Sequence, residues 1–422
     1  MEQSPAGPAP TIDALPPRHL LRIAMVTESY PPEVNGVANS VARVVKGLQG
    51  RGHCVQLVRP QQSRARRADE TAGSDEILTA GVAIPMYGHL RMGLPSRRAL
   101  LKAWSQHPPD LVHIATEGPL GWSALQAALA LKLPVCSDFR TNFQAYSQFY
   151  RLGWLHKPIT AYLRTFHNRC HCTMVPTDVL RRQLDASGFR LLSVVARGVD
   201  TQLFSPEKRS AALRRQWGAG DGDVVVLHVG RLAPEKNLGL LLHAFARIQS
   251  VQQGVRLVVV GDGPSRAAMQ AQCPQAIFAG FRSGEDLAAH YASSDVFLFP
   301  SLTETYGNVT PEAMASGLAV VAFDDAAAGQ LIQHESSGLL APKGDSAAFL
   351  QLAGDLAVDH ERRNSLGRLA RTRSLGLGWD QVIRKVEGVY AGVIRRAYAP
   401  TVWCGAPASA AGASQHQGTS IR

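Results

Sequence analysis

The chain has 422 residues, of which 45% are apolar, so it is too long for one compact core and fits two domains of ordinary size. Its formal net charge is +11, and the first 200 residues carry +9 of it. No apolar run reaches the roughly 18 to 20 residues of a spanning helix, and no secretory segment precedes the first predicted strand, which argues against a membrane-spanning or secreted protein.

The six cysteines are few and scattered, which favours a reduced compartment. Cys170-His171-Cys172 has the residue types of a metal site, but no second ligand pair lies nearby in the sequence. We therefore expect these cysteines to pack in a core. The expected location is cytoplasmic, at most peripheral on the inner face of the cytoplasmic membrane.

The first half of the chain alternates short apolar segments with helical segments. A proline-rich leader over residues 1–19 is expected to be disordered, and residues 36–50 have the apolar spacing of a helix. This alternation is typical of a doubly wound parallel sheet, and it predicts a first Rossmann-like domain over residues 20–200. The predicted buried strands are residues 23–26, 55–58, 111–114, 135–136, 173–175 and 193–195.

The same alternation restarts at Val224 and predicts a second Rossmann-like domain over residues 201–378. An amphipathic crossover helix is expected over residues 379–399, and a disordered tail over residues 400–422. The fold class is therefore α/β, with two doubly wound domains and a cleft between them. The predicted strands are residues 224–229, 257–260, 277–278, 296–299 and 318–322.

Two glutamates, Glu304 and Glu312, flank a glycine-bearing loop between a predicted strand and a predicted helix. Open α/β sheets bind ligands at such junctions, where free backbone N–H groups and Gly307 let a phosphate approach closely. A carboxylate on each side suits a ligand with a hydroxylated ring at both ends, such as a nucleotide sugar. The alternative is that Glu304 is a solvated loop residue and Glu312 merely favours its helix start.

Four segments together carry a family resemblance. Residues 304–322 read ETYGNVTPEAMASGLAVVA, and the other three read GRLAPEKNL at 230–238, VGDGP at 260–264 and ESYPPEVNGV at 28–37. In this order and spacing they resemble the retaining glycosyltransferases of family 4, from about Arg22 to about Tyr398. The resemblance implies the GT-B fold, in which the domain at 20–200 would be the acceptor side and the domain at 201–378 would bind the nucleotide sugar. It also implies a bacterial mannosyltransferase-like or glucosyltransferase-like activity.

Arg231 and Lys236 follow the first strand of the second domain in one loop, from which both cations could reach the cleft. The resemblance makes them the clamp on the leaving diphosphate, and it assigns Glu304 to the transferred hexose. The alternative is that both are exposed loop cations.

The resemblance also names donor-binding positions. Glu312 would bind the ribose, Gly36 would approach the phosphates from the first domain, and Gly263 would support the nucleotide side. Phe281 could lie along the base or pack in a core. The backbone amides expected on the phosphates are those of Gly307, Asn308 and Val309.

Arg140 stands where many relatives carry a histidine that faces the cleft. Arginine cannot accept a proton at neutral pH, so no general base acts from this position. The resemblance implies a phosphate oxygen of the leaving group as the proton acceptor, and Arg140 could hold the diphosphate or an anionic acceptor. Asp138 and Glu117 are acceptor-side candidates, although Asp138 could simply cap a segment. His113 is expected to be a buried strand residue.

A basic segment predicts a membrane contact. Arg97, Arg98 and Lys102 share a helical face, while Leu94, Leu101 and Trp104 supply an apolar side that could lie in a lipid interface. The alternative is a surface helix that packs its apolar stripe on the sheet. The basic first domain favours an anionic membrane surface and a lipid acceptor such as diacylglycerol, with a glycan acceptor also open.

Other classes fit less well. Asp221-Gly222-Asp223 precedes its strand, so turn chemistry explains it better than metal binding, and we expect no metal and no cofactor. The sequence lacks nucleic-acid-binding signatures. We therefore expect a retaining, metal-independent transfer of mannose or glucose from a GDP-mannose or UDP-glucose type donor to a hydroxyl.

Three alternatives remain. One is a nucleotide-sugar epimerase of the same fold, and another is a non-catalytic, membrane-associated nucleotide-sugar-binding protein. The third is a nicotinamide-dependent oxidoreductase, although neither half has its glycine signature.

Overall fold

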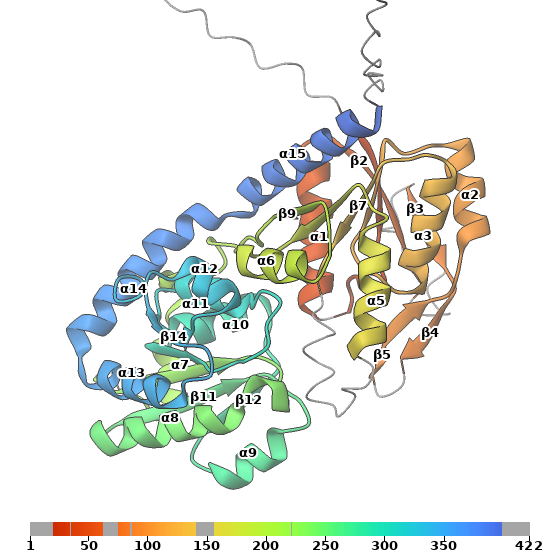
Figure 1. The fold of residues 1–422 in the computed structure, drawn as a ribbon. Helices are drawn as coiled ribbons and strands as arrows, with labels where there is room; N and C mark the ends of the chain where they lie inside the picture. The colour runs from red at the N-terminus through yellow and green to blue at the C-terminus, as the bar shows by residue number, and fades with distance from the viewer. Residues whose placement is uncertain are drawn as a thin grey trace, which may run out of the picture.

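The structure is a computed structural model, and it describes residues 20–33, 35–61, 75–84, 87–140, 156–220 and 222–398. The leader predicted at 1–19 and the tail predicted at 400–422 lie outside the described residues. Two lobes are present, each built on a parallel sheet flanked by helices (Figure 1). The predicted architecture of two Rossmann-like domains is confirmed.

The N-lobe contains a seven-stranded parallel sheet in the order β3-β2-β1-β6-β7-β8-β9. Its central strands are buried along their length, as parallel strands covered on both faces must be. A short antiparallel hairpin, β4-β5, lies beside it. The strands are β1 Arg22–Val26, β2 Cys54–Pro60, β3 Glu76–Thr79, β4 Gly81–Ile84, β5 Tyr87–Gly93, β6 Leu111–Ile114, β7 Val135–Asp138, β8 Cys172–Val175 and β9 Leu192–Val194.

Helices connect these strands. The first begins after Asn35, whose Oδ1 accepts hydrogen bonds from the amides of Val37 and Ala38 at 3.0 and 2.8 Å and so caps the helix. Cys170 and Cys172 are buried, as expected for core residues. The N-lobe helices are α1 Gly36–Gly50, α2 Arg97–Gln106, α3 Pro119–Ala130, α5 His156–His167 and α6 Asp178–Ala186.

The C-lobe contains a six-stranded parallel sheet in the order β12-β11-β10-β13-β14-β15. Its first strand is a run of mostly valines and is fully buried, which suits a central position. The strands are β10 Val224–Val229, β11 Val255–Val260, β12 Ile277–Gly280, β13 Val296–Phe299, β14 Ala319–Phe323 and β15 Leu339–Ala341. The helices are η2 Pro206–Lys208, α7 Ala211–Gln216, η3 Pro234–Lys236, α8 Leu238–Val251, α9 Arg266–Gln272, α10 Gly284–Ala292, α11 Val309–Ala315, α12 Ala326–Leu331, α13 Ser346–Val358, α14 His360–Ser374 and η4 Leu375–Leu377.

The last helix, α15 Trp379–Tyr398, runs from the C-lobe back to the N-lobe, where it lies along α1 (Figure 1). Ile383, Val386, Tyr390 and Val393 are spaced three or four residues apart and are buried in the N-lobe core. Full burial of such a side chain contributes roughly 1.5 to 3 kcal/mol, so this stripe fastens the helix to the N-lobe. The predicted crossover helix is confirmed.

Helix α2 corrects one interpretation of the sequence. Its Leu100 and Trp104 are buried, and Trp104 Nε1 donates to Gln56 Oε1 at 3.0 Å. The apolar stripe therefore packs on the N-lobe core, and the interpretation that Trp104 belongs to a lipid-facing side is wrong. Within the described residues, no helix combines the length and the apolar content needed to cross a bilayer.

Candidate active site

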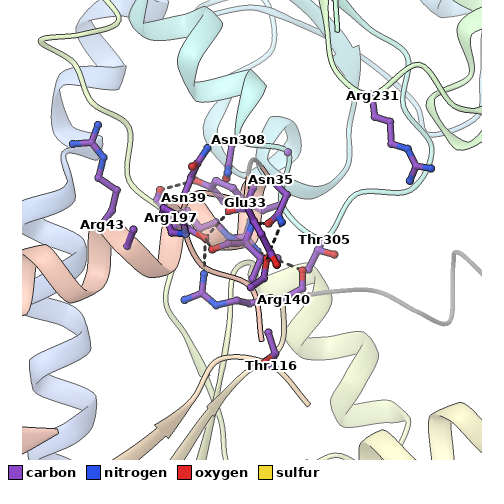
Figure 2. A pocket seen from close by; sticks show the side chains of 18 of the residues that line it. Glu33, Asn35, Asn39, Arg43, Thr116, Arg140, Arg197, Arg231, Thr305 and Asn308 are labelled. Carbon is purple, nitrogen blue, oxygen red and sulfur yellow. Dashed lines mark hydrogen bonds between the residues drawn. The ribbon is translucent and has the colours of Figure 1, made fainter. Parts of the chain in front are cut away.

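A deep cleft separates the two lobes, and the loops that follow the carboxyl ends of β1, β6, β10, β11 and β13 line it (Figure 2). Parallel sheets place ligand sites at this end of their strands. Every site residue predicted from the sequence lines the cleft except Asp138. The predicted residues that line it are Gly36, Glu117, Arg140, Arg231, Lys236, Gly263, Phe281, Glu304, Gly307, Asn308, Val309 and Glu312.

On the C-lobe wall, Lys236 forms an ion pair with Glu304. The lysine ends the short helix η3, and the glutamate follows β13. Glu304 Oε1 also accepts a hydrogen bond from Ser301 Oγ at 2.8 Å, so two contacts fix the carboxylate. Arg231 lies further out, with Nη1 3.9 Å from Glu235 Oε1 and its side chain 39% exposed. Both predicted clamp cations therefore line the same wall.

Glu312 lies in the first turn of α11, and Tyr291 Oη donates to its Oε2 at 3.0 Å. Burial raises the pKa of this carboxyl to about 7. Gly307, in the loop before the helix, has a φ of +89°, which a residue with a Cβ rarely adopts. This glycine lets the chain turn between the two glutamates.

The two lobes come close at the start of α1. A Cβ added at Gly36 would lie 3.5 Å from Asn308 Nδ2, so the first helix of the N-lobe and the N-cap of α11 face each other across the cleft. On the nucleotide side, a Cβ at Gly263 would lie 2.4 Å from the Leu232 carbonyl oxygen, which requires glycine there. Phe281 is 57% exposed at the cleft, so the structure does not pack it in a core.

Arg140 is held on the N-lobe wall by its neighbours. Its Nε donates to Asp138 Oδ2 at 2.7 Å, and its Nη1 donates to Ser40 Oγ at 2.6 Å. Asp138 Oδ2 also lies 3.0 Å from His113 Nε2, and His113 Nδ1 lies 2.5 Å from Tyr390 Oη on α15. A buried chain of contacts thus links the crossover helix to the cleft.

The contacts with Arg140 and His113 explain where the Asp138 side chain lies. Burial alone would raise the pKa of its carboxyl, but Arg140 and His113 lower it overall. Asp138 lines a small cavity behind Arg140 and not the cleft, so the expectation of a hydroxyl contact at the cleft is not met. His113 is buried, as expected.

Two carboxyl groups lie in the N-lobe part of the cleft lining, that of Glu117 buried and that of Glu28 partly buried. Burial raises the pKa of Glu117 to about 8 and that of Glu28 to about 7. Glu28 Oε1 accepts from the Leu120 amide at 2.9 Å, whereas Glu117 Oε1 is buried without a hydrogen-bond partner among the described residues. The sequence analysis did not single out Glu28 as a site residue, although its place after β1 is the same signal that selected Glu117 after β6.

Arg197, between β9 and the C-lobe, is a second residue that the sequence analysis did not select. It lines the cleft, and Tyr306 Oη donates to its carbonyl oxygen at 3.0 Å. Burial and the nearby charge of Arg140 lower the pKa of its guanidinium to about 10. It lies in the segment between the domains, where no strand-end motif draws attention to it.

Comparison with known proteins defines the class. Residues 34–203 match the family described as Glycosyltransferase Family 4, and residues 223–359 match the one described as Glycosyl transferases group 1. The GT-B fold is also that of sucrose-phosphate synthase from Thermosynechococcus elongatus, at a TM-score of 0.74 and 18% identity over 89% of this chain and 100% of that one. The two facing Rossmann-like domains are therefore those of a GT-B glycosyltransferase.

Curated relatives narrow the class. A GDP-mannose-dependent alpha-mannosyltransferase of Mycobacterium tuberculosis is 36% identical over 88% of this chain and 97% of its own length. An alpha-monoglucosyldiacylglycerol synthase of Streptococcus pneumoniae is 28% identical over 76% of this chain and 75% of its own. The chain belongs to glycosyltransferase family 4, and it is a hexosyltransferase.

Proposed function

We propose that this protein transfers mannose or glucose, with retention of the anomeric configuration and without a metal ion, from a nucleotide diphosphate sugar to the hydroxyl of an acceptor. The observation that carries the proposal is the C-lobe wall, where Arg231, Lys236, Glu304 and Glu312 line one cleft with the turn at Gly307 between the two glutamates. Similarity to a GDP-mannose-dependent enzyme makes GDP-mannose the first donor to test.

The residues supply the chemistry as follows. The bond between the anomeric carbon and the diphosphate oxygen breaks, and Lys236 and Arg231 offset the negative charge that grows on the leaving group. The acceptor oxygen bonds to the same face of the sugar, and its proton passes to an oxygen of the departing diphosphate. Glu304 orients the hexose hydroxyls. Arg140 takes no part as a base, because a guanidinium keeps its protons.

We propose a membrane lipid as the acceptor, in line with the diacylglycerol named for a relative. Arg97, Arg98 and Lys102 are exposed on α2, and Arg97 also lines the cleft. Val82 and Met92 pair across the β4-β5 hairpin and are exposed, as is the following Leu94. These six residues, called here the docking face, combine basic charge with exposed apolar side chains. An anionic membrane attracts such a surface.

A donor screen tests the proposed reaction. Purified protein is incubated with labelled GDP-mannose or UDP-glucose and diacylglycerol vesicles, with and without a chelator. Free nucleoside diphosphate and a glycolipid whose anomer matches the donor, formed equally with chelator present, support the proposal. An epimerised donor would indicate an epimerase, a bound but unconsumed donor would indicate a binding module, and an inverted product would refute retention.

Vesicle binding tests the docking face. Replacing Arg97, Arg98 and Lys102 together by Gln is expected to weaken binding to anionic vesicles on the order of 100-fold, because each basic residue near the surface contributes about 1 kcal/mol. The matched control replaces Arg181, Arg182 and Arg190 by Gln. This variant loses the same number of positive charges, but from the opposite end of the sheet. Equal binding by both triple variants would discard the docking face.

A further inference from the structure

Arg197 is a partly buried cation whose charge is not neutralised by an ion pair among the described residues. Its guanidinium lies in the cleft lining, and no carboxylate of the described residues lies within ion-pair distance of it. Its contacts are a long hydrogen bond from Nη2 to the Arg140 carbonyl oxygen, at 3.5 Å, and the face of the Tyr306 ring, whose centroid is 5.8 Å from Cζ. Neither contact supplies a full negative charge.

Arg214, a buried arginine, shows the contacts of a structural role. Its guanidinium donates to the carbonyl oxygens of Gly220, Asp223 and Ser293 and to the carboxylate of Asp295, at 2.8 to 3.0 Å. A buried charge with such partners stabilises a fold, whereas one without them costs free energy. Arg197 lacks these partners and also has the like charge of Arg140 nearby.

The geometry of this wall is suited to an anion. Arg140 and Arg197 lie together, while Arg231 lies apart in the same view (Figure 2). On the C-lobe wall Lys236 already faces Glu304. An oxyanion beside Arg197 would supply the charge that the protein does not, and two guanidinium groups offer donors arranged for phosphate or carboxylate oxygens.

We propose that Arg197 and Arg140 form a second oxyanion-binding subsite, separate from Arg231 and Lys236, that holds an acidic group of a substrate during transfer. The inference rests on the proposed function and deepens it. The shared chemistry is a phosphate, carboxylate or sulfonate group, which belongs either to the diphosphate of the donor or to an acidic head group of the acceptor.

The subsite also joins the two lobes. Arg140 follows β7 of the N-lobe, whereas Tyr306, which contacts Arg197 through its ring and its hydroxyl, lies in the loop that carries Glu304. An anion held by both arginines would therefore influence the position of the loop that carries Glu304. Occupation of this subsite favours the arrangement of the lobes in which the transfer residues face each other.

The test compares Arg197→Gln with wild type, with Arg197→Lys as the conservative variant. Calorimetry measures the binding of GDP and of inorganic pyrophosphate, which needs no turnover. Kinetics measure KM with diacylglycerol, a neutral acceptor, and with phosphatidylinositol, an acidic one. Thermal unfolding is compared with that of Arg214→Gln, the change at a buried arginine whose Nη1 and Nη2 each donate two hydrogen bonds.

Loss of a hydrogen bond to a charged group weakens binding by roughly 10- to 100-fold. Such a loss for both GDP and pyrophosphate identifies the donor as the source of the anion. Unchanged GDP binding with a raised KM for phosphatidylinositol alone identifies the acceptor. In either case Arg197→Gln unfolds at a Tm no lower than wild type, and Arg197→Lys restores part of the binding.

The proposal is overturned if Arg197→Gln changes none of these binding constants or KM values, and equally if it lowers Tm as much as Arg214→Gln does with binding intact. A wild-type protein that consumes no nucleotide sugar would refute the proposed function, and the subsite is then judged on pyrophosphate binding alone.

Discussion

The two walls of the cleft differ in whether their charged side chains are paired with opposite charges. On the C-lobe wall, Lys236 pairs with Glu304 and Arg231 lies near Glu235, so each cation has a carboxylate from its own lobe. On the N-lobe wall, Glu117 is buried and Glu28 is partly buried, both with raised pKa values, and Arg197 has no carboxylate of the described residues within ion-pair distance. The two cations of the C-lobe wall are thus paired before a substrate arrives, whereas the N-lobe wall keeps groups that a substrate can satisfy.

This difference indicates which wall of the cleft selects the substrate. On a wall whose cations are already paired, an entering diphosphate replaces a carboxylate as the partner of a cation. We therefore expect the residues of this wall to act mainly on the charge of the leaving group. On a wall with unpaired polar groups, a ligand that supplies their hydrogen-bond or ionic partners gains more binding free energy, because buried polar atoms without partners cost free energy. We therefore assign the common chemistry to the C-lobe wall and acceptor discrimination to the N-lobe wall.

The largest effect is expected on the C-lobe wall. Lys236→Ala and Glu304→Ala should each lower kcat by roughly 100-fold or more, because each removes a group directed at the reacting centre. The measurement is initial rate with saturating donor, together with circular dichroism to show that the fold is intact. Lys343→Ala is the control, since Lys343 pairs with Asp325 at 2.7 Å outside the cleft. Near-normal rates in both cleft variants would refute the assignment.

The N-lobe wall should lose stability when the buried ion pair between Asp138 and Arg140 is broken. Asp138→Asn removes the carboxylate shared by Arg140 and His113, and we expect the free energy of unfolding in urea to fall by about 3 kcal/mol. Asp178→Asn, in the exposed pair with Arg181, should cause no measurable change. Equal stability of the two variants would show that Asp138 does not hold the wall together.

The raised pKa of Glu117 predicts a pH dependence of stability. Because burial raises the pKa of Glu117 to about 8, the folded protein binds a proton there that the unfolded chain has released above pH 4.5. The contribution to stability is therefore fully present below pH 4.5 and is lost as pH rises through about 8. Tm should fall between pH 5 and pH 8, less steeply in Glu117→Gln than in wild type. The exposed Glu285→Gln should keep the wild-type slope, and an unchanged slope in Glu117→Gln would contradict the prediction.

The smallest effect is expected at the crossover helix. Tyr390→Phe removes the hydroxyl that contacts His113 but keeps the buried ring, so unfolding should become easier by about 1 kcal/mol. Transfer rates should stay within about twofold, a change worth less than 0.5 kcal/mol of barrier, because Tyr390 does not line the cleft. A large loss of activity with unchanged Tm would instead show that the contact chain from α15 to Arg140 controls the reaction.

Much of the fold and of the C-lobe wall was predictable from the sequence. Alternating strands and helices depend on local periodicity, and Gly307, Glu304 and Glu312 lie within nine residues of chain, so their proximity follows from one turn. The N-lobe wall was less predictable. Glu28, Arg140 and Arg197 come from segments far apart in sequence, and no local pattern shows that they line the same cleft.

The sequence by itself therefore determined the two doubly wound domains, the crossover helix and the candidate donor residues, because these depend on neighbours along the chain. Only the tertiary structure decided that Trp104 packs inward, that Asp138 lies behind Arg140, and that Arg197 forms no ion pair within the part of the chain that the structure describes. Burial and charge compensation depend on which remote segments pack together, and the composition of a segment does not specify its distant partners.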